Sequence, residues 1–192
     1  MKTILAFDTA TSTASCALVE DGVPLGEQLT DARSVLAAAA ALLREAGLTP
    51  GAIDALVVGT GPGSFTSIRM GLATARGLAL ALDVPAAGVS TLHAFAGGRP
   101  VIDARRGEVF SSGPSLARPE ELEVAGERLV GDGAIRYRDV FEARGAEIPP
   151  DDDPAHLPAA QLLVARAVAF GPAAALEPLY LRDPDAKPLS AR

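Results

Sequence analysis

Asp8 is the first residue whose type and position suit chemistry, because it ends a short apolar run that begins at Thr3. Thr9, Thr11 and Ser12 follow it, so one carboxylate and several hydroxyls gather at the end of a predicted strand. Oxygen ligands placed there would suit a nucleotide and Mg²⁺. The same residues equally suit a local turn, in which Asp and Thr side chains bond to their own backbone. The sequence leaves both interpretations open.

A second candidate is the turn Gly61-Pro62-Gly63-Ser64, which opens onto an alanine- and leucine-rich helix predicted to reach Leu82. Unpaired N–H groups and the dipole at a helix start favour an anion such as a nucleotide phosphate. The spacing lacks the lysine of a P-loop and the third glycine of a dinucleotide fingerprint. A structural turn, with Ser64 as the helix cap, is the alternative. The residues of the nucleotide-binding hypothesis are Asp8, Thr9, Thr11, Gly61, Gly63 and Ser64.

The two histidines, His93 and His156, belong to no H-x-x-x-H or H-E-x-x-H pair. We therefore expect no metal site and no metal-dependent hydrolase. The run DARRGE at residues 103–108 concentrates charge between two predicted strands. It is either a solvated hairpin, or a pair of arginines that clamps an anion or forms a salt bridge across a lobe interface.

The composition restricts the partners and the compartment. The chain has 192 residues, 48% of them hydrophobic, which is enough for a core in one domain or two small lobes. Its net charge of -7 disfavours direct nucleic-acid binding, so such a role would need a partner protein. The single cysteine, Cys16, excludes an intramolecular disulfide. No apolar run is long enough for a membrane span or a signal-peptide core, so we expect a cytoplasmic protein without membrane contact.

Periodicity and turn signals predict an α/β fold with a mixed sheet. The predicted strands are residues 3–7, 14–19, 23–29, 53–58, 86–89, 101–103 and 108–110, and the predicted helices are 34–46, 65–82, 90–95 and 157–170. A change of composition after Gly98 divides the chain into lobes at residues 1–98 and 99–192. The tail Lys187–Arg192 is predicted to be disordered.

The two long predicted helices carry small residues among their leucines, which allows another helix to approach closely. Apolar residues recur at helical spacing on both helices, so each stripe covers its own sheet or docks a partner. The pattern alone does not assign the faces. Because paired small-residue helices are self-complementary, we also expect a homodimer when no other partner is present.

Five segments resemble the TsaB (YeaZ) family, in the family's order and across almost the full chain. They are ILAFDTAT at 4–11, GPGSFTSIRMGLATARGLA at 61–79, GVSTLHAFA at 88–96, DARRGEVF at 103–110 and EPLYLRD at 177–183. The resemblance implies two lobes of the actin-like ATPase (ASKHA) type, each with a mixed sheet flanked by helices, the second lobe being shortened after Phe110. It also implies a role in forming threonylcarbamoyladenosine at the adenosine next to the anticodon of tRNAs that read ANN codons.

In that family the subunit is non-catalytic and pairs with TsaD, the ATPase TsaE joins the assembly, and tRNA is reached only through the complex. The family's pairing surface maps onto the predicted helices 34–46 and 65–82. The partner-interface residues expected there are Val35, Leu36, Ala39, Ala40, Leu43, Arg69, Leu72, Ala75, Arg76 and Ala79. No cofactor is expected to be required, with ATP or ADP fitting the complex interface. Ser67 departs from the family pattern, which has a glycine at this position.

Two other functions compete with the accessory role. One is an actin-like nucleotide-binding ATPase or phosphotransferase that uses Asp8 and the Gly61 turn. The other is a peptidase, which we rank last because the chain lacks a metal-binding pair and a G-x-S-x-G frame around Ser64.

Overall fold

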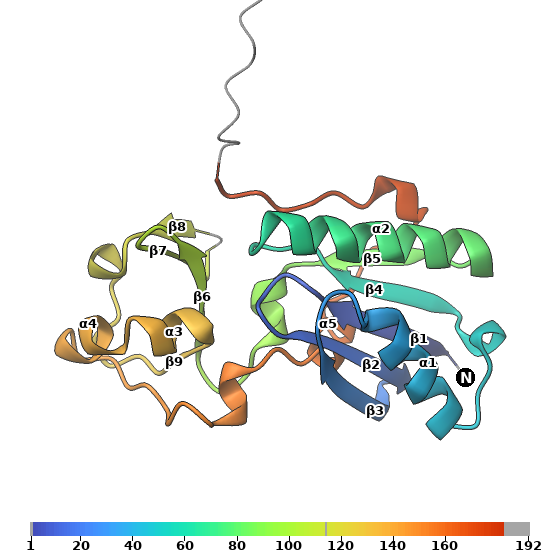
Figure 1. Cartoon of the computed structure of the whole chain (residues 1–192), viewed down its shortest axis with the longest axis horizontal. Helices are drawn as coiled ribbons and strands as arrows, with labels where there is room; N and C mark the ends of the chain where they lie inside the picture. Colours follow the sequence, from blue (N-terminus) through green and yellow to red (C-terminus); the bar gives the residue numbers. More distant parts are fainter. Residues whose placement is uncertain (1, 114, 183–192) are drawn as a thin grey trace, which may run out of the picture.

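The computed structural model describes residues 2–113 and 115–182, which fold into two lobes lying side by side (Figure 1), each built on a mixed β-sheet. The first lobe contains β1 (Thr3–Asp8), β2 (Ala14–Glu20), β3 (Val23–Thr30), α1 (Val35–Glu45), β4 (Ala55–Gly59), α2 (Phe65–Leu82) and β5 (Ala86–Val89). Short 3-10 turns lie at Pro50–Ala52 and Thr91–Ala94. The predicted strands and long helices of this lobe are confirmed to within a few residues.

The first sheet has the order β3-β2-β1-β4-β5, in which β1 runs antiparallel to β2 and parallel to β4. Phe7 of β1 is paired with Cys16 on one side and Val58 on the other. The β2–β3 hairpin turns at Asp21-Gly22, both with positive φ, as a two-residue turn between twisted strands requires. These pairings bring the carboxyl ends of β1 and β4 to the same edge of the sheet.

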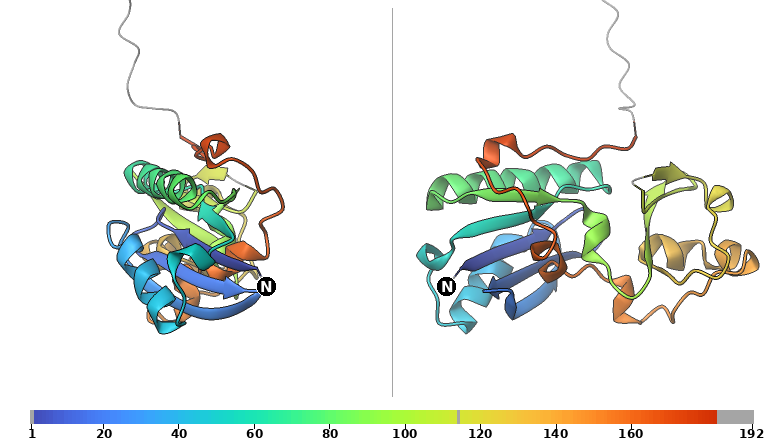
Figure 2. Two further views of the ribbon diagram at one scale, coloured as in Figure 1. Left: turned by 90° about the vertical axis from the view of Figure 1, so that its right-hand side faces the viewer. Right: turned by 180° about the vertical axis from the view of Figure 1, so that it is seen from behind.

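Both faces of the first sheet are covered. Alternate residues of β1, such as Leu5 and Phe7, pack against α1 and α2, which lie on the same side of the sheet (Figure 2). The opposite set, including Ala6, faces Leu92 of the 3-10 turn and Leu163 near the C-terminus. Because neither face meets water, β1 and β4 are buried along their whole length.

The second lobe contains β6 (Arg99–Arg105), β7 (Glu108–Ser111), β8 (Ser115–Ala117), β9 (Leu129–Val130), α3 (Asp132–Arg136) and α4 (Arg138–Ala143). Its sheet has the order β8-β7-β6-β9, and Val101, Val109 and Phe141 lie in its core. β8, α3 and α4 are too short for periodicity to reveal, and the sequence pattern does not predict them.

The chain returns to the first lobe after a 3-10 turn at Pro154–His156, within the segment 99–192 that the sequence predicts as the second lobe. The N–H of Ala159 donates to the backbone oxygen of Ala94, and Ala86 and Gly171 exchange backbone hydrogen bonds. The predicted helix 157–170 is wrong, because only α5 (Gln161–Val164) is helical. Gly171 pairs with Ala86 at the edge of β5, which keeps residues 165–170 from continuing α5. This tertiary contact outweighs their helical propensity.

The last described segment, residues 172–182, is named here the C-terminal strap. It begins with a 3-10 turn at Ala173–Ala175 and runs along α2 toward the second lobe (Figure 1). Nη2 of Arg76 donates to the carbonyl of Leu176 at 2.5 Å, and the N–H of Leu179 donates to the carbonyl of Thr60 at 2.8 Å. The predicted disordered tail, 187–192, lies outside the described residues.

Candidate functional site

Asp8 is fully buried, and both of its carboxylate oxygens accept hydrogen bonds from the protein itself. Oδ1 accepts from the N–H of Ala10 at 2.8 Å, and Oδ2 accepts from Oγ1 of Thr91 at 2.6 Å. Gly59 of β4 lies so close that a Cβ at this position would overlap Oδ2. Burial raises the pKa of Asp8, while the hydrogen bonds from Thr91 and Ala10 lower it. The Asp8 carboxylate therefore forms its hydrogen bonds inside the first lobe and is not exposed to solvent.

The hydroxyls that follow Asp8 are engaged in a similar way. Thr9 is buried, and its Oγ1 donates to the carbonyl of Ser67 at 2.7 Å, which ties the end of β1 to the start of α2. Oγ1 of Thr11 donates to the carbonyl of Thr13 at 2.7 Å. The side chains of Asp8 and Thr9 thus form hydrogen bonds within the fold, and their nucleotide-binding roles stay a prediction.

The turn at residues 61–64 positions the first residues of α2. The N–H of Gly61 donates to Oγ1 of Thr91 at 3.0 Å, and its φ of +102° is one that favours glycine. Oγ of Ser64 accepts from the N–H of Ser67 at 3.4 Å, which confirms Ser64 as the helix cap. Oγ of Ser67 donates to the same oxygen at 3.0 Å, so Ser67 adds a polar contact at the start of α2.

A cleft of about 1070 Å³ lies between the lobes, with walls formed by the starts of α1 and α2, by β6 and α3, and by the C-terminal strap. Of the six residues predicted to bind a nucleotide, Thr11, Gly63 and Ser64 line this cleft, and the other three do not. Its charged lining residues are Asp31, Asp103, Asp132, Arg33, Arg105 and Arg182. The cleft can therefore offer both carboxylates and guanidinium groups to a ligand.

The charged run at 103–108 forms contacts within its lobe and with the strap. Asp103 pairs with Arg105 at 3.3 Å inside the second lobe. Arg182 of the strap donates to the carbonyl of Ala104 at 3.0 Å and forms an ion pair with Glu108. Arg105 therefore pairs within its own lobe, and the ion pair that links the strap to the charged run is formed by Arg182 and Glu108.

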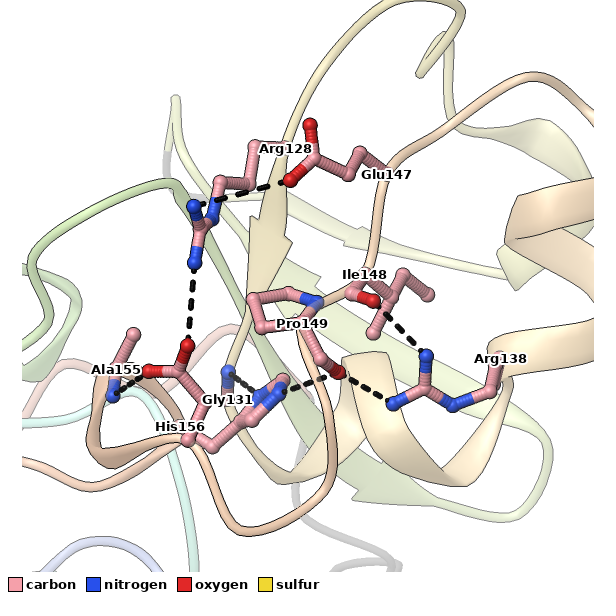
Figure 3. Close-up of polar contacts among 9 residues, drawn as sticks. Arg128, Gly131, Arg138, Glu147, Ile148, Pro149, Ala155 and His156 are labelled. Carbon is pink, nitrogen blue, oxygen red and sulfur yellow. Dashed lines mark hydrogen bonds and ion pairs between the residues drawn. The ribbon is translucent and has the colours of Figure 1, made fainter.

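His156 is a buried structural residue of the second lobe (Figure 3). Its Nδ1 accepts from the N–H of Gly131 at 3.0 Å, so the proton of the neutral ring lies on Nε2, which faces the carbonyl of Pro149 at 3.2 Å. Arg138 donates to the carbonyls of Ile148 and Pro149 at 3.0 and 2.6 Å. Across the described residues, no group of three or more His, Cys, Asp or Glu side chains is arranged to hold a metal ion.

The structure assigns the faces of α1 and α2 that the sequence leaves open. Six residues predicted at the partner interface are buried against the first sheet: Val35, Ala39, Leu43, Leu72, Ala75 and Ala79. Their side chains pack against the first sheet and contribute little exposed surface, and their role at a partner interface stays a prediction. The other four, Leu36, Ala40, Arg69 and Arg76, are exposed.

Further exposed residues extend this surface beyond those predicted. Phe65 begins α2, and its ring stacks on Tyr180 of the strap with centroids 5.0 Å apart. The guanidinium of Arg69 lies 3.9 Å from the centroid of Phe65, and its Nε donates to the hydroxyl of Tyr180 at 2.8 Å. Leu80 is 86% exposed. Leu80 lies on α2 opposite the buried apolar stripe, so helical spacing alone could have identified it as exposed. The stacking of Phe65 on Tyr180 has no local sequence signal.

Comparisons with known proteins agree with this geometry. The family model for TsaD, tRNA N6-adenosine threonylcarbamoyltransferase, matches residues 29–152. An uncharacterised protein of Mycobacterium tuberculosis is 38% identical over a 215-residue alignment that covers 99% of this chain and 96% of that protein. The tRNA threonylcarbamoyladenosine biosynthesis protein TsaB of Escherichia coli is 39% identical over 121 residues, covering 56% of this chain and 52% of that protein.

Among solved structures, YeaZ from Pseudomonas aeruginosa superposes with a TM-score of 0.77 and 28% sequence identity. The superposition covers 94% of this chain and 100% of that chain, so both lobes are included. No helix in the described part of this chain has the length and apolarity to cross a membrane.

Proposed function

Since the chain belongs to the TsaB (YeaZ) family, whose named members are tRNA threonylcarbamoyladenosine biosynthesis proteins, we propose that it is a non-catalytic accessory subunit in that process. In the proposed assembly it pairs with TsaD, and TsaE joins them in the cytoplasm. The modified base is the adenosine next to the anticodon of tRNAs that read ANN codons, and tRNA is contacted through the complex.

The observation that carries this proposal is the helical face, which we define as the exposed surface of α1 and α2. α1 exposes Leu36 and Ala40 one turn apart, and α2 exposes Ala73, Gly77 and Leu80 at spacings of three and four residues. No atom would lie within 4 Å of a Cβ added at Gly77. Small side chains with open space above them let a partner helix approach closely. The same face would pair two copies when TsaD is absent.

The surroundings of Asp8 support a non-catalytic role. In an actin-like phosphotransferase this carboxylate would meet a metal ion and a phosphate, but here both oxygens accept hydrogen bonds from Ala10 and Thr91. Gly59 closes the remaining space above Oδ2. Because a carboxylate held this way is not offered to a ligand, we propose that it maintains the packing of β1 on β4.

The pairing surface is tested by titration calorimetry with TsaD from the same genome. Leu36 is 52% exposed, so Leu36→Glu should leave the fold intact and weaken binding at least tenfold, because a charge replaces an apolar contact. Val23→Glu is the matched control, since Val23 is 63% exposed at the hairpin end of β3 and belongs to neither helix. Unchanged affinity for Leu36→Glu would contradict the proposed surface.

The role itself is tested by reconstitution of TsaD, TsaE and tRNA with and without this chain, with modified adenosine measured by mass spectrometry. Product that forms only when the chain is present supports the accessory role. Equal product in both reactions would refute it. The Leu36→Glu and Val23→Glu variants, added in place of the wild type, connect this readout to the helical face.

The cleft supports the alternative function, an actin-like ATPase or phosphotransferase. Its volume of about 1070 Å³ is sufficient for a nucleotide, and the start of α2 and Arg33 line it. We propose that the chain needs no cofactor of its own, and that any ATP or ADP of the complex lies at the complex interface. ATP turnover by the isolated chain that Arg33→Gln abolishes would favour this alternative over the accessory role, because Arg33 lines the cleft.

A further inference from the structure

The arginines of the first lobe gather at the helical face, unlike those of the second lobe and the strap. Before Arg99 the chain has four arginines, and all four belong to the helical face or its edge: Arg33, Arg44, Arg69 and Arg76. All four are exposed. Among the described residues, none of these four guanidinium groups forms an ion pair, defined as a nitrogen within 4.0 Å of a carboxylate oxygen.

The second lobe and the strap differ in this respect. Six of their arginines form ion pairs with nearby carboxylates: Arg99, Arg105, Arg128, Arg136, Arg138 and Arg182. The helices of the first lobe have few carboxylates to offer, since residues 35–44 and 65–82 contain no Asp or Glu. Asp31 precedes α1 and interacts electrostatically with Arg33, and Glu45 and Asp83 lie at the far ends of α1 and α2. The helical face is thus positively charged on a chain whose net charge is -7.

Two of these arginines are held in place without being neutralised. Nη2 and Nε of Arg76 donate to the carbonyls of Leu176 and Ala173, and Nε of Arg69 donates to the hydroxyl of Tyr180. These acceptors carry no charge, so the positive charge remains at a fixed position along α2. An arginine whose side chain is already ordered loses less entropy when it binds a carboxylate.

We propose that the helical face selects a partner protein whose docking surface presents carboxylates opposite these four arginines. The inference rests on the proposed function and adds the chemistry of the partner to it. Protein is favoured over nucleic acid because the arginines surround small and apolar side chains, Leu36, Ala73 and Leu80 among them, which do not contact phosphates productively. The charge steers the encounter and fixes the register of the helices.

The test measures TsaD binding by calorimetry at 50 and 300 mM NaCl, with two charge-reversal variants. Arg33→Glu/Arg44→Glu changes exposed side chains that donate no hydrogen bond within the described residues, and we expect at least tenfold weaker binding at low salt. The difference should shrink at high salt, where exposed charges are screened. The control, Arg118→Glu/Arg166→Glu, has the same change of charge on exposed residues away from α1 and α2, and should stay within twofold of the wild type.

A second pair of variants separates charge from folding. Arg33→Gln/Arg44→Gln removes the charge without placing an acid at the end of α1, and should lose an intermediate part of the affinity. Arg33→Lys/Arg44→Lys keeps the charge and should retain most of it. Melting temperatures measured by circular dichroism verify that every variant is folded.

Each contrary result has a distinct meaning. Equal TsaD affinity for the wild type and both reversal variants overturns the charge inference alone. Absence of wild-type binding at either salt concentration overturns the proposed function together with the inference. Loss of direct tRNA binding in the Arg33→Glu/Arg44→Glu variant, with TsaD binding retained, would assign the arginines to nucleic acid. A change confined to self-association in sedimentation would assign them to a second copy.

Discussion

Thr91 forms the hydrogen bond that holds the buried Asp8 carboxylate, and replacing Thr91 gives a quantitative test of that bond. Oγ1 of Thr91 donates to the Asp8 carboxylate at 2.6 Å and accepts from the N–H of Gly61 at 3.0 Å. Thr91→Val keeps the side-chain volume and removes both bonds. A buried charge-assisted bond is worth about 1.5–3 kcal/mol, and an orphaned N–H costs about 1–3 kcal/mol. We therefore expect a loss of about 3–5 kcal/mol in the free energy of unfolding.

Thr91→Ser is the matched control, because it retains the hydroxyl and removes one buried methyl group, at a cost of about 1 kcal/mol. In urea unfolding followed by circular dichroism, the two variants should differ by about 2–4 kcal/mol. A Thr91→Val variant that is as stable as Thr91→Ser would refute the assigned hydrogen bonds.

The pH dependence of this difference follows from the raised pKa of Asp8. Because the folded protein holds the proton more tightly than the unfolded chain, this group contributes most stability below its unfolded pKa of about 3.9. The contribution is lost as the pH rises through the folded pKa. Thr91→Val removes a bond that lowers the folded pKa, so the difference between the two variants should be larger at pH 8 than near pH 4. A difference that is smaller at pH 8 than near pH 4 would contradict the hydrogen bond from Thr91 to the Asp8 carboxylate.

Three further outcomes are expected. Gly59→Ala should lower the melting temperature severely, since its Cβ would overlap the carboxylate of Asp8, and should leave little soluble wild-type-like protein. A loss of even about 1 kcal/mol shifts the melting temperature of a chain this long by about 2–4 °C, so a melting curve within 2 °C of the wild type would contradict the packing. His156→Ala should cost about 2–4 kcal/mol in chemical unfolding, because it leaves the N–H of Gly131 unpaired and opens a cavity, while the carbonyl of Pro149 keeps its bond from Arg138; His156→Gln should recover part of this loss. Cys16 is buried and its thiol pKa is raised to about 12, so a thiol-specific reagent at pH 8 should label it in native protein only as fast as the lobe opens, and rapidly in urea.

The sequence predicts the first lobe well because its signals are local. Continuous apolar runs locate β1 and β4, and Ser64 marks the start of α2 by a cap that needs only its neighbour Ser67. The candidate site is less accessible to such reasoning. The sequence around Asp8 looks the same whether its carboxylate binds a ligand or Thr91. Asp8 and Thr91 are 83 residues apart in the chain, so no local pattern links them.

The helix faces and the C-terminal region show the same limit. Val35 and Leu36 are adjacent apolar residues, but the first is buried and the second is half exposed, because one faces the sheet and the other faces solvent. Residues 165–170 have helical propensity, but pairing of Gly171 with Ala86 keeps them out of a helix. Both outcomes depend on where a distant strand lies, which periodicity cannot supply.

The return of the chain to its first lobe also determines the order in which the protein can be completed during synthesis. Leu163 and Leu176 fill the two faces of the first sheet, although most of that sheet precedes residue 90. Contacts of such long sequence separation form late, because the intervening loop must close first. The second lobe has a core of its own, but Ile102, Phe110 and Val130 also join the cluster on one face of the first sheet. A chain that ends shortly before residue 160 would therefore leave apolar surface uncovered on both faces of the first sheet.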